Sequence, residues 1–168
     1  LNLAQGTLLK DFECALNNYL GALGGVITNS GSQAQMAILL AIGIQKGDEV
    51  ILPTYVCKSV YDAVIALNGT PVLCDISRNW LMTYESVSVC VTEKTKAIIL
   101  VHLFGMDAWD DRFEDFGIPI IEDFCQAFGL NKIRTSNKSG IASFYSFNAT
   151  KCLTTCEGGF ATTTDSNI

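Results

Sequence analysis

The sequence is poor in histidine, proline and basic residues. One histidine, three prolines and 11 lysines and arginines stand among 168 residues, against 17 aspartates and glutamates, so the net charge is −6. Binding of a phosphate backbone needs a basic face, and the acidic balance therefore argues against a nucleic-acid partner. The spacing Cys152-x-x-x-Cys156 lacks a second pair or a nearby histidine, so we expect no metal site.

Long apolar runs are also missing. The longest, Met36–Ile44 and Ala97–Leu103, fall well short of the ~18 residues that a membrane-spanning helix requires. No basic segment precedes an apolar stretch at the amino end, which argues against a signal peptide. We therefore expect a protein without a membrane partner.

Cysteine, in contrast, is plentiful. The seven cysteines are odd in number, and most lie inside apolar stretches that have strand or helix character. This pattern predicts small core residues of a reduced, cytoplasmic protein rather than a disulfide framework.

Apolar residues make up 49% of the chain and the mean hydropathy is +0.30, which suits a sheet covered on both faces. The length fits one domain. Strands are expected at Glu49–Leu52, Pro71–Asp75, Lys96–Leu103, Ile118–Asp123, Ala142–Ser146 and Gly159–Thr163, and helical segments at Phe12–Leu23, Gln33–Ile44, Ser59–Leu67, Tyr84–Val91 and Asp107–Phe116. Their alternation predicts an α/β fold with a mainly parallel sheet and helices on both faces. Ser32 with Gln35 fits a capping box at the second helix.

Three kinds of chemical group stand at the ends of expected elements, where ligands bind in such sheets. Lys151 could form a Schiff base once its amine is neutral, although a lone loop lysine is usually solvated. Asp123 could keep a pyridine nitrogen protonated, or it could cap a turn. Gly31 and Ser32 open a helix whose N–H groups suit a phosphate. Together these groups predict a site for pyridoxal 5'-phosphate (PLP).

Two further residues fit the same ligand. Ser146 stands five residues before Lys151 and could donate its hydroxyl to the phosphate, or it could be an ordinary strand serine. Gln126, three residues past Asp123, could hydrogen-bond the phenolic oxygen of the ring, or it could be a surface polar residue.

The sequence resembles the DegT/DnrJ/StrS-type sugar aminotransferases, a branch of the fold-type I PLP-dependent enzymes. Six motifs recur in family order from about residue 26 to the end. They are Asn29–Ser32, Gly47–Pro53, Pro71–Ile76, Thr95–Gly105, Ile121–Asp123 with Gln126–Gly129, and Ser146–Gly159. Each motif alone is of modest specificity, and their order makes the match specific.

The resemblance implies a role for each candidate residue. Lys151 would carry the Schiff base, Asp123 would meet the pyridinium nitrogen and Gln126 would lie near the phenolic oxygen. Gly31, Ser32 and Ser146 would hold the phosphate. The family moves an amino group, usually from glutamate or glutamine, to a keto group of a nucleotide-linked sugar or a similar cyclic ketone. Its members are homodimers that complete each other's active sites.

The chain departs from the family at a few positions. An aromatic ring that stacks on the cofactor is usual where Cys57 stands, so stacking is either lost or taken by Tyr55. Cys152 and Cys156 replace residues that are more often asparagine and glycine. Lys151 is intact, which argues against the dehydratase relatives that carry histidine there.

Family members also continue past the strand that follows Gly159 and add a small carboxyl-terminal domain. The resemblance therefore implies that residues 1–168 form a partial PLP-binding large domain without that small domain. One alternative is a catalytically silent family member that acts as a binding or dimerisation module. Another is an unrelated α/β protein that binds a different phosphate ligand at Gly31 and Ser32.

Overall fold

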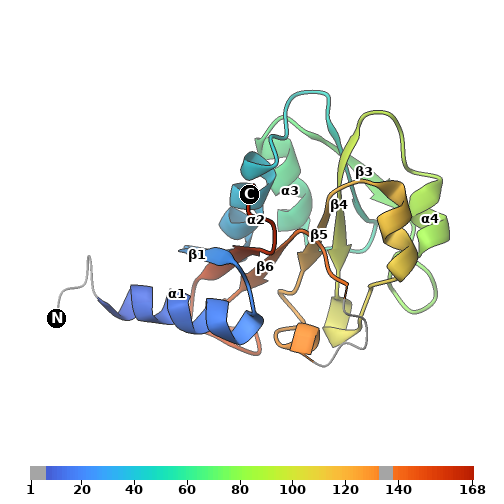
Figure 1. Ribbon diagram of the computed structural model, residues 1–168. Coiled ribbons are helices and arrows are strands. Elements are labelled where there is room, and N and C mark those ends of the chain that lie inside the picture. Colours follow the sequence, from blue (N-terminus) through green and yellow to red (C-terminus); the bar gives the residue numbers. More distant parts are fainter. Residues whose placement is uncertain (1–6, 133–137) are drawn as a thin grey trace.

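A seven-stranded mixed sheet organises the part of the chain that the computed structural model describes, residues 7–132 and 138–168 (Figure 1). The strand order is β1-β7-β6-β5-β4-β2-β3. The pairs β2–β3, β2–β4, β4–β5 and β5–β6 are parallel, and β7 is antiparallel to both β6 and β1. The predicted fold class, α/β with a mainly parallel sheet, is confirmed.

The strands are β1 (Gly24–Thr28), β2 (Glu49–Pro53), β3 (Thr70–Cys74), β4 (Thr95–Val101), β5 (Ile120–Asp123), β6 (Ala142–Ser146) and β7 (Gly159–Thr163). The helices are α1 (Thr7–Leu20), α2 (Gly31–Ala41), α3 (Lys58–Ala66) and α4 (Tyr84–Ser88), with short 3-10 helices η1 (Leu103–Gly105), η2 (Asp111–Phe116) and η3 (Leu130–Lys132). Six strands lie where the sequence predicts them. The edge strand β1 was not predicted, and residues 1–6 and 133–137 of the expected domain lie outside the described residues.

Helices cover both faces of the sheet, as expected, and strand β4 shows how the two faces divide. Ile99 packs in one cluster with Leu39 of α2 and Val64 of α3. Its neighbour Ile98 packs in a second cluster with Phe113 of η2. Successive side chains of a strand point to opposite faces, so α2 and α3 lie on one face while α4 and η2 lie on the other. Figure 1 shows α2 and α3 side by side.

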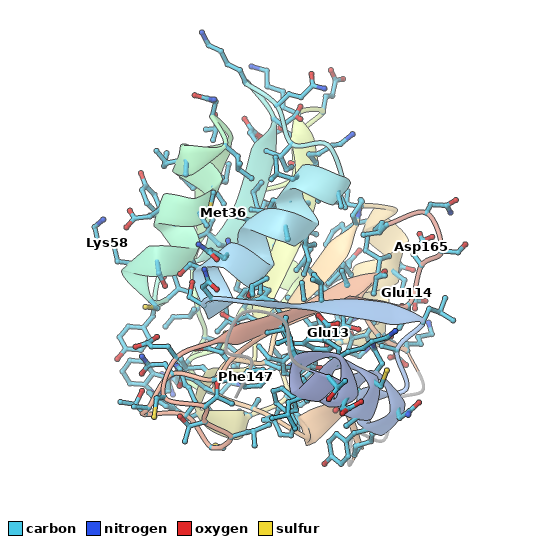
Figure 2. The ribbon with its side chains drawn as sticks, turned by 90° about the vertical axis from the view of Figure 1, so that its left-hand side faces the viewer. Glu13, Met36, Lys58, Glu114, Phe147 and Asp165 are labelled. Atoms are coloured by element: carbon cyan, nitrogen blue, oxygen red, sulfur yellow. The ribbon has the colours of Figure 1, made fainter. Side chains whose placement is uncertain are left out.

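Helix α1 packs beside the edge strand β1. Its buried residues Leu16 and Leu20 belong to an aromatic cluster with Phe147 and Phe160. The carboxylate of Glu13 accepts a hydrogen bond of 3.0 Å from the Ile27 N–H of β1. Figure 2 labels Glu13 between α1 and β1, and Phe147 beside α1.

The first helix differs from its predicted span of Phe12–Leu23. It ends at Leu20 because Gly21 adopts a left-handed conformation, with φ of +71°, that terminates helices. No helix of the described segments has the length and apolarity that crossing a membrane would require.

The prediction that the cysteines are mainly core residues is wrong for most of them. Cys74 is buried and Cys90 and Cys125 are partly buried. Cys14, Cys57, Cys152 and Cys156 are exposed. All seven are free thiols. Apolar sequence neighbours did not imply burial here because four of these cysteines lie in a turn or on an outward helix face.

Candidate active site

A pocket of about 340 Å³ opens at the carboxyl ends of the parallel strands, and we call it the carboxyl-edge pocket. All seven residues that the sequence singled out line it: Gly31, Ser32, Cys57, Asp123, Gln126, Ser146 and Lys151. A larger cavity of about 430 Å³ lies elsewhere and is lined by none of the seven. The structure thus brings together groups that are up to 120 positions apart in sequence, from 31 to 151.

The start of α2 forms one end of this pocket. Ser30 caps the helix from an extended backbone conformation, and its hydroxyl accepts a hydrogen bond of 3.3 Å from the Gln33 N–H. The carboxamide oxygen of Gln33 reaches back to the Asn29 N–H, also at 3.3 Å. The predicted capping box of Ser32 and Gln35 is therefore wrong by two residues. Ser30, Gly31 and Ser32 all line the pocket, so the positive end of the helix dipole lies there.

Gly31 is required at this helix start by close packing. A Cβ atom at Gly31 would lie 2.9 Å from the Ser146 Cβ and 3.2 Å from the Cys125 Sγ. Both contacts are tighter than ordinary van der Waals distance, so a side chain would displace the walls of the pocket. The absence of one lets an anion approach the helix N-terminus closely.

Asp123 lies at the end of β5 and is 4% exposed. Its Oδ1 accepts a hydrogen bond of 2.8 Å from the Cys125 N–H. Burial raises the pKa of the Asp123 carboxyl, while its hydrogen bonds with Cys125 and the positive charges of His102 and Lys151 act in the opposite direction. A buried carboxyl of this kind is suited to pairing with a cationic ring nitrogen.

Lys151 follows β6 in a turn that its neighbours hold in place. The Lys151 N–H donates to the Asn148 carbonyl at 2.9 Å. The Asn148 side chain accepts from the Thr150 N–H at 3.2 Å and donates to Glu157 at 3.1 Å. Ser146, at the end of β6, accepts from the Asn148 N–H at 3.4 Å. Asn148, Thr150 and Glu157 line the pocket too, and they could not be predicted from the sequence because short turn residues carry little signal.

Gln126 lines the pocket, and the oxygen of its carboxamide is already hydrogen-bonded. Its Oε1 accepts a hydrogen bond of 3.2 Å from the Phe104 N–H, and Phe104 has a left-handed φ of 54°. Because the oxygen is used, the Nε2 group is the part that can donate to a ligand.

Cys57 stands at the N-terminus of α3, on the wall of the pocket, where its sulfur accepts from the Ser59 hydroxyl at 3.2 Å. Tyr55 does not take the place of a stacking ring. It packs edge-on against Trp80, with ring centroids 5.0 Å apart, and it is not part of the pocket lining.

Comparisons with known proteins identify the family and the fold. The model of the DegT/DnrJ/EryC1/StrS aminotransferase family matches residues 2–168. NtdA from Bacillus subtilis, solved with its bound cofactor PMP, is 31% identical with a TM-score of 0.88. An aminotransferase from Psychrobacter cryohalolentis is 28% identical with a TM-score of 0.88. GDP-4-keto-6-deoxymannose-3-dehydratase with bound GDP-perosamine is 26% identical with a TM-score of 0.81.

The chain is shorter than these relatives. The three alignments cover 97%, 99% and 95% of this chain but 38%, 44% and 45% of the respective solved chains. The described fold therefore corresponds to less than half of each relative. Within that span the folds superpose with TM-scores of 0.81 to 0.88, and the chain belongs to the DegT/DnrJ/EryC1/StrS aminotransferase family.

Proposed function

We propose that the protein is a PLP-dependent aminotransferase that moves an amino group from glutamate or glutamine to a keto group of a nucleotide-linked sugar or a similar cyclic ketone. The observation that carries the proposal is the meeting of Lys151, the buried Asp123 and the N-terminus of α2 in one pocket. Family membership supports it, as do a relative with bound PMP and another with a bound nucleotide sugar.

The residues of the carboxyl-edge pocket fit the cofactor. Its volume of about 340 Å³ falls in the usual range for small-molecule sites. One end offers a helix N-terminus with Gly31 and the Ser146 hydroxyl, which suit a phosphate. The inner part offers the Asp123 carboxyl, which suits a protonated ring nitrogen, and Lys151 provides an amine beside it.

When bound, PLP supplies an electrophilic aldehyde and a ring that withdraws electrons. The side chains of this protein position and protonate the reacting groups. Lys151 would hold the aldehyde of the cofactor through its amine, and the same amine would serve as the general base that moves a proton. Asp123 would keep the ring nitrogen protonated, and Gln126 would donate its Nε2–H to the phenolic oxygen. Gly31, Ser32 and Ser146 would bind the phosphate, and Cys57 would stand on the side of the ring.

Two further parts of the proposal rest on family resemblance and composition. A homodimer is proposed because family members complete each other's sites. A cytoplasmic location is proposed because all seven cysteines are free thiols, which a reducing compartment maintains.

Covalent attachment tests the proposal directly. After incubation with PLP and borohydride reduction, we expect the intact mass to rise by one reduced cofactor, and the adduct to be lost in Lys151→Ala. Lys58→Ala is the matched control, since Lys58 pairs with Asp62 on the exposed face of α3. An adduct of equal extent in wild type and Lys151→Ala would overturn the assignment. Release of 2-oxoglutarate from glutamate, tested across nucleotide-linked keto sugars, then identifies the acceptor.

A second candidate follows from Cys57. A small thiol in place of a stacking ring favours a protein that binds the cofactor or dimerises without turnover. Cofactor attachment without amino transfer to any keto sugar would support this candidate, and turnover would exclude it.

A further inference from the structure

Gln35 is a buried glutamine in the second turn of α2 that also lines the carboxyl-edge pocket. It is 1% exposed, and its Nε2 donates a hydrogen bond of 2.9 Å to the Val60 carbonyl at the start of α3. Its Oε1 is buried and has no hydrogen-bond partner within the described residues. Leaving a buried acceptor unpaired destabilises the folded state, so a group that donates to this oxygen would be stabilising.

The orientation of the carboxamide follows from its partner. Exchanging the oxygen and nitrogen would set Oε1 against the Val60 carbonyl oxygen, and two acceptors repel one another. The nitrogen is therefore fixed on Val60, and the oxygen is the buried atom of this pocket-lining side chain that has no partner among the described residues.

Gln35 and Asp123 lie at similar depth. Gly31 contacts Ser146 at the rim of the pocket, where a Cβ at Gly31 would lie 2.9 Å from the Ser146 Cβ. From there α2 leads away from the carboxyl edge, so Gln35 lies about 6 Å deeper, four residues at 1.5 Å each. Along β6, Phe144 lies about 7 Å deeper than Ser146. Phe144 pairs in register with Asp123, so Asp123 lies at about the same depth as Gln35. Both residues are therefore at the inner end of the pocket.

We propose that the carboxamide oxygen of Gln35 is a second acceptor beside Asp123, and that it binds a donor group of the small molecule held in the pocket. For the cofactor proposed above, on which this inference rests, the donor is the protonated ring nitrogen. Phosphate oxygens offer no donor at neutral pH, and the phenolic oxygen is assigned to Gln126. The ring nitrogen is therefore the group that both Asp123 and Gln35 can accept from.

The test compares two ligands on three proteins. Dissociation constants for PLP and for its analogue with carbon in place of the ring nitrogen are measured on wild type, Gln35→Leu and Gln35→Met. We expect PLP affinity to fall about ten-fold in both variants, the loss of one hydrogen bond to a charged donor, while affinity for the carbon analogue stays unchanged. Gln45→Leu, an exposed glutamine after α2, is the control and should alter neither constant.

Each other outcome overturns the inference. An equal fall for both ligands would mean that Gln35 acts only by tying α2 to α3 through Val60. An unchanged PLP affinity would mean that the oxygen meets no ligand group. If wild type binds neither ligand, the proposed function fails as well. If wild type binds PLP and the variants match it, only the role of Gln35 fails. Gln35→Met keeps the side-chain length and covers the case in which Gln35→Leu does not fold.

Discussion

Gly159 of β7 lies directly against the backbone of Ser30, the residue that caps α2. A Cβ atom at Gly159 would lie 2.4 Å from the Ser30 carbonyl oxygen and 2.7 Å from the Gly31 nitrogen. Real Cβ atoms do not approach other atoms this closely. The missing side chain therefore sets how near β7 comes to the start of α2, and with it the position of the N–H groups at the α2 end of the pocket.

Gly159→Ala should damage both the fold and the site. The methyl group forces β7 and α2 apart, and we expect the free energy of unfolding to fall by about 1–3 kcal/mol. Binding of PLP should weaken because the helix start moves. Urea unfolding and PLP titration check both effects. Gly24→Ala on β1 is the control, because nothing lies within 4 Å of its added Cβ. Equal effects of the two substitutions would refute the packing argument.

Asp123→Asn should stabilise the protein without its cofactor and weaken cofactor binding. Burial raises the pKa of Asp123, so the folded state holds its proton more tightly than the unfolded state. The free energy of unfolding of the wild type then falls as pH rises above about 4, the ordinary pKa of this carboxyl. The reason is that the unfolded chain releases the proton there while the folded chain still holds it. Asparagine stays neutral and can still accept from the Cys125 N–H. The stability gain of the variant should therefore grow with pH above about 4.

Urea unfolding from pH 4 to pH 8 measures that gain, and PLP titration measures the loss. Asp62→Asn, an exposed carboxylate on α3, is the control and should show no such growth. A stability difference that shrinks with pH would mean that the charged form of Asp123 is favoured by the fold. Unchanged PLP affinity in Asp123→Asn would mean that the ring nitrogen has another partner.

The residues of the site could be predicted from the sequence more accurately than the backbone structure around them. The ends of β5 and β6 were clear from their apolar runs, which is why Asp123 and Ser146 were expected to converge with the Asn29–Ser32 turn. The helix cap was harder, because Ser-x-x-Gln occurs twice in overlap, as Ser30 with Gln33 and as Ser32 with Gln35. The extended backbone of Ser30 selects the first pair. That register makes Gln33 a capping residue and leaves Gln35 buried.

Strand β1 was not predicted, because its sequence also carries too weak a pattern. It begins with two glycines, and its residues are half-buried or exposed, so neither an apolar run nor a clean alternation marks it. Its position depends on tertiary contacts, with β7 on one side and the Glu13 carboxylate of α1 on the other. Gln35 had one readable signal, a glutamine next to the apolar run from Met36 to Ala41, but only the structure shows that its oxygen has no partner among the described residues.

Cys156→Gly should stabilise the turn that follows Lys151. Cys156 adopts a left-handed conformation, with φ of +70°, which costs a non-glycine residue about 1–2 kcal/mol. Glycine removes that strain but loses more chain entropy on folding, so we expect a net gain of about 0.5–1 kcal/mol in the free energy of unfolding. Thermal or urea unfolding measures it. Cys152→Gly, at an exposed position without positive φ, should destabilise instead, and a gain there too would contradict the strain argument.

Cys57→Phe tests whether the pocket has unfilled space beside Cys57, where a second ring could stack on a bound cofactor ring. Cys57 lines the pocket and is exposed, so a phenyl group has room to lie over a bound ring. Ring pairs contribute about 0.5–1.5 kcal/mol, and PLP affinity should rise about three- to ten-fold. Tyr55→Ala is the control, because the Tyr55 ring packs on Trp80 outside the pocket and should leave the affinity unchanged. A fall in PLP affinity for Cys57→Phe would contradict this. It would show that the bound ligand already fills the space beside the Cys57 thiol, so that no second ring fits there.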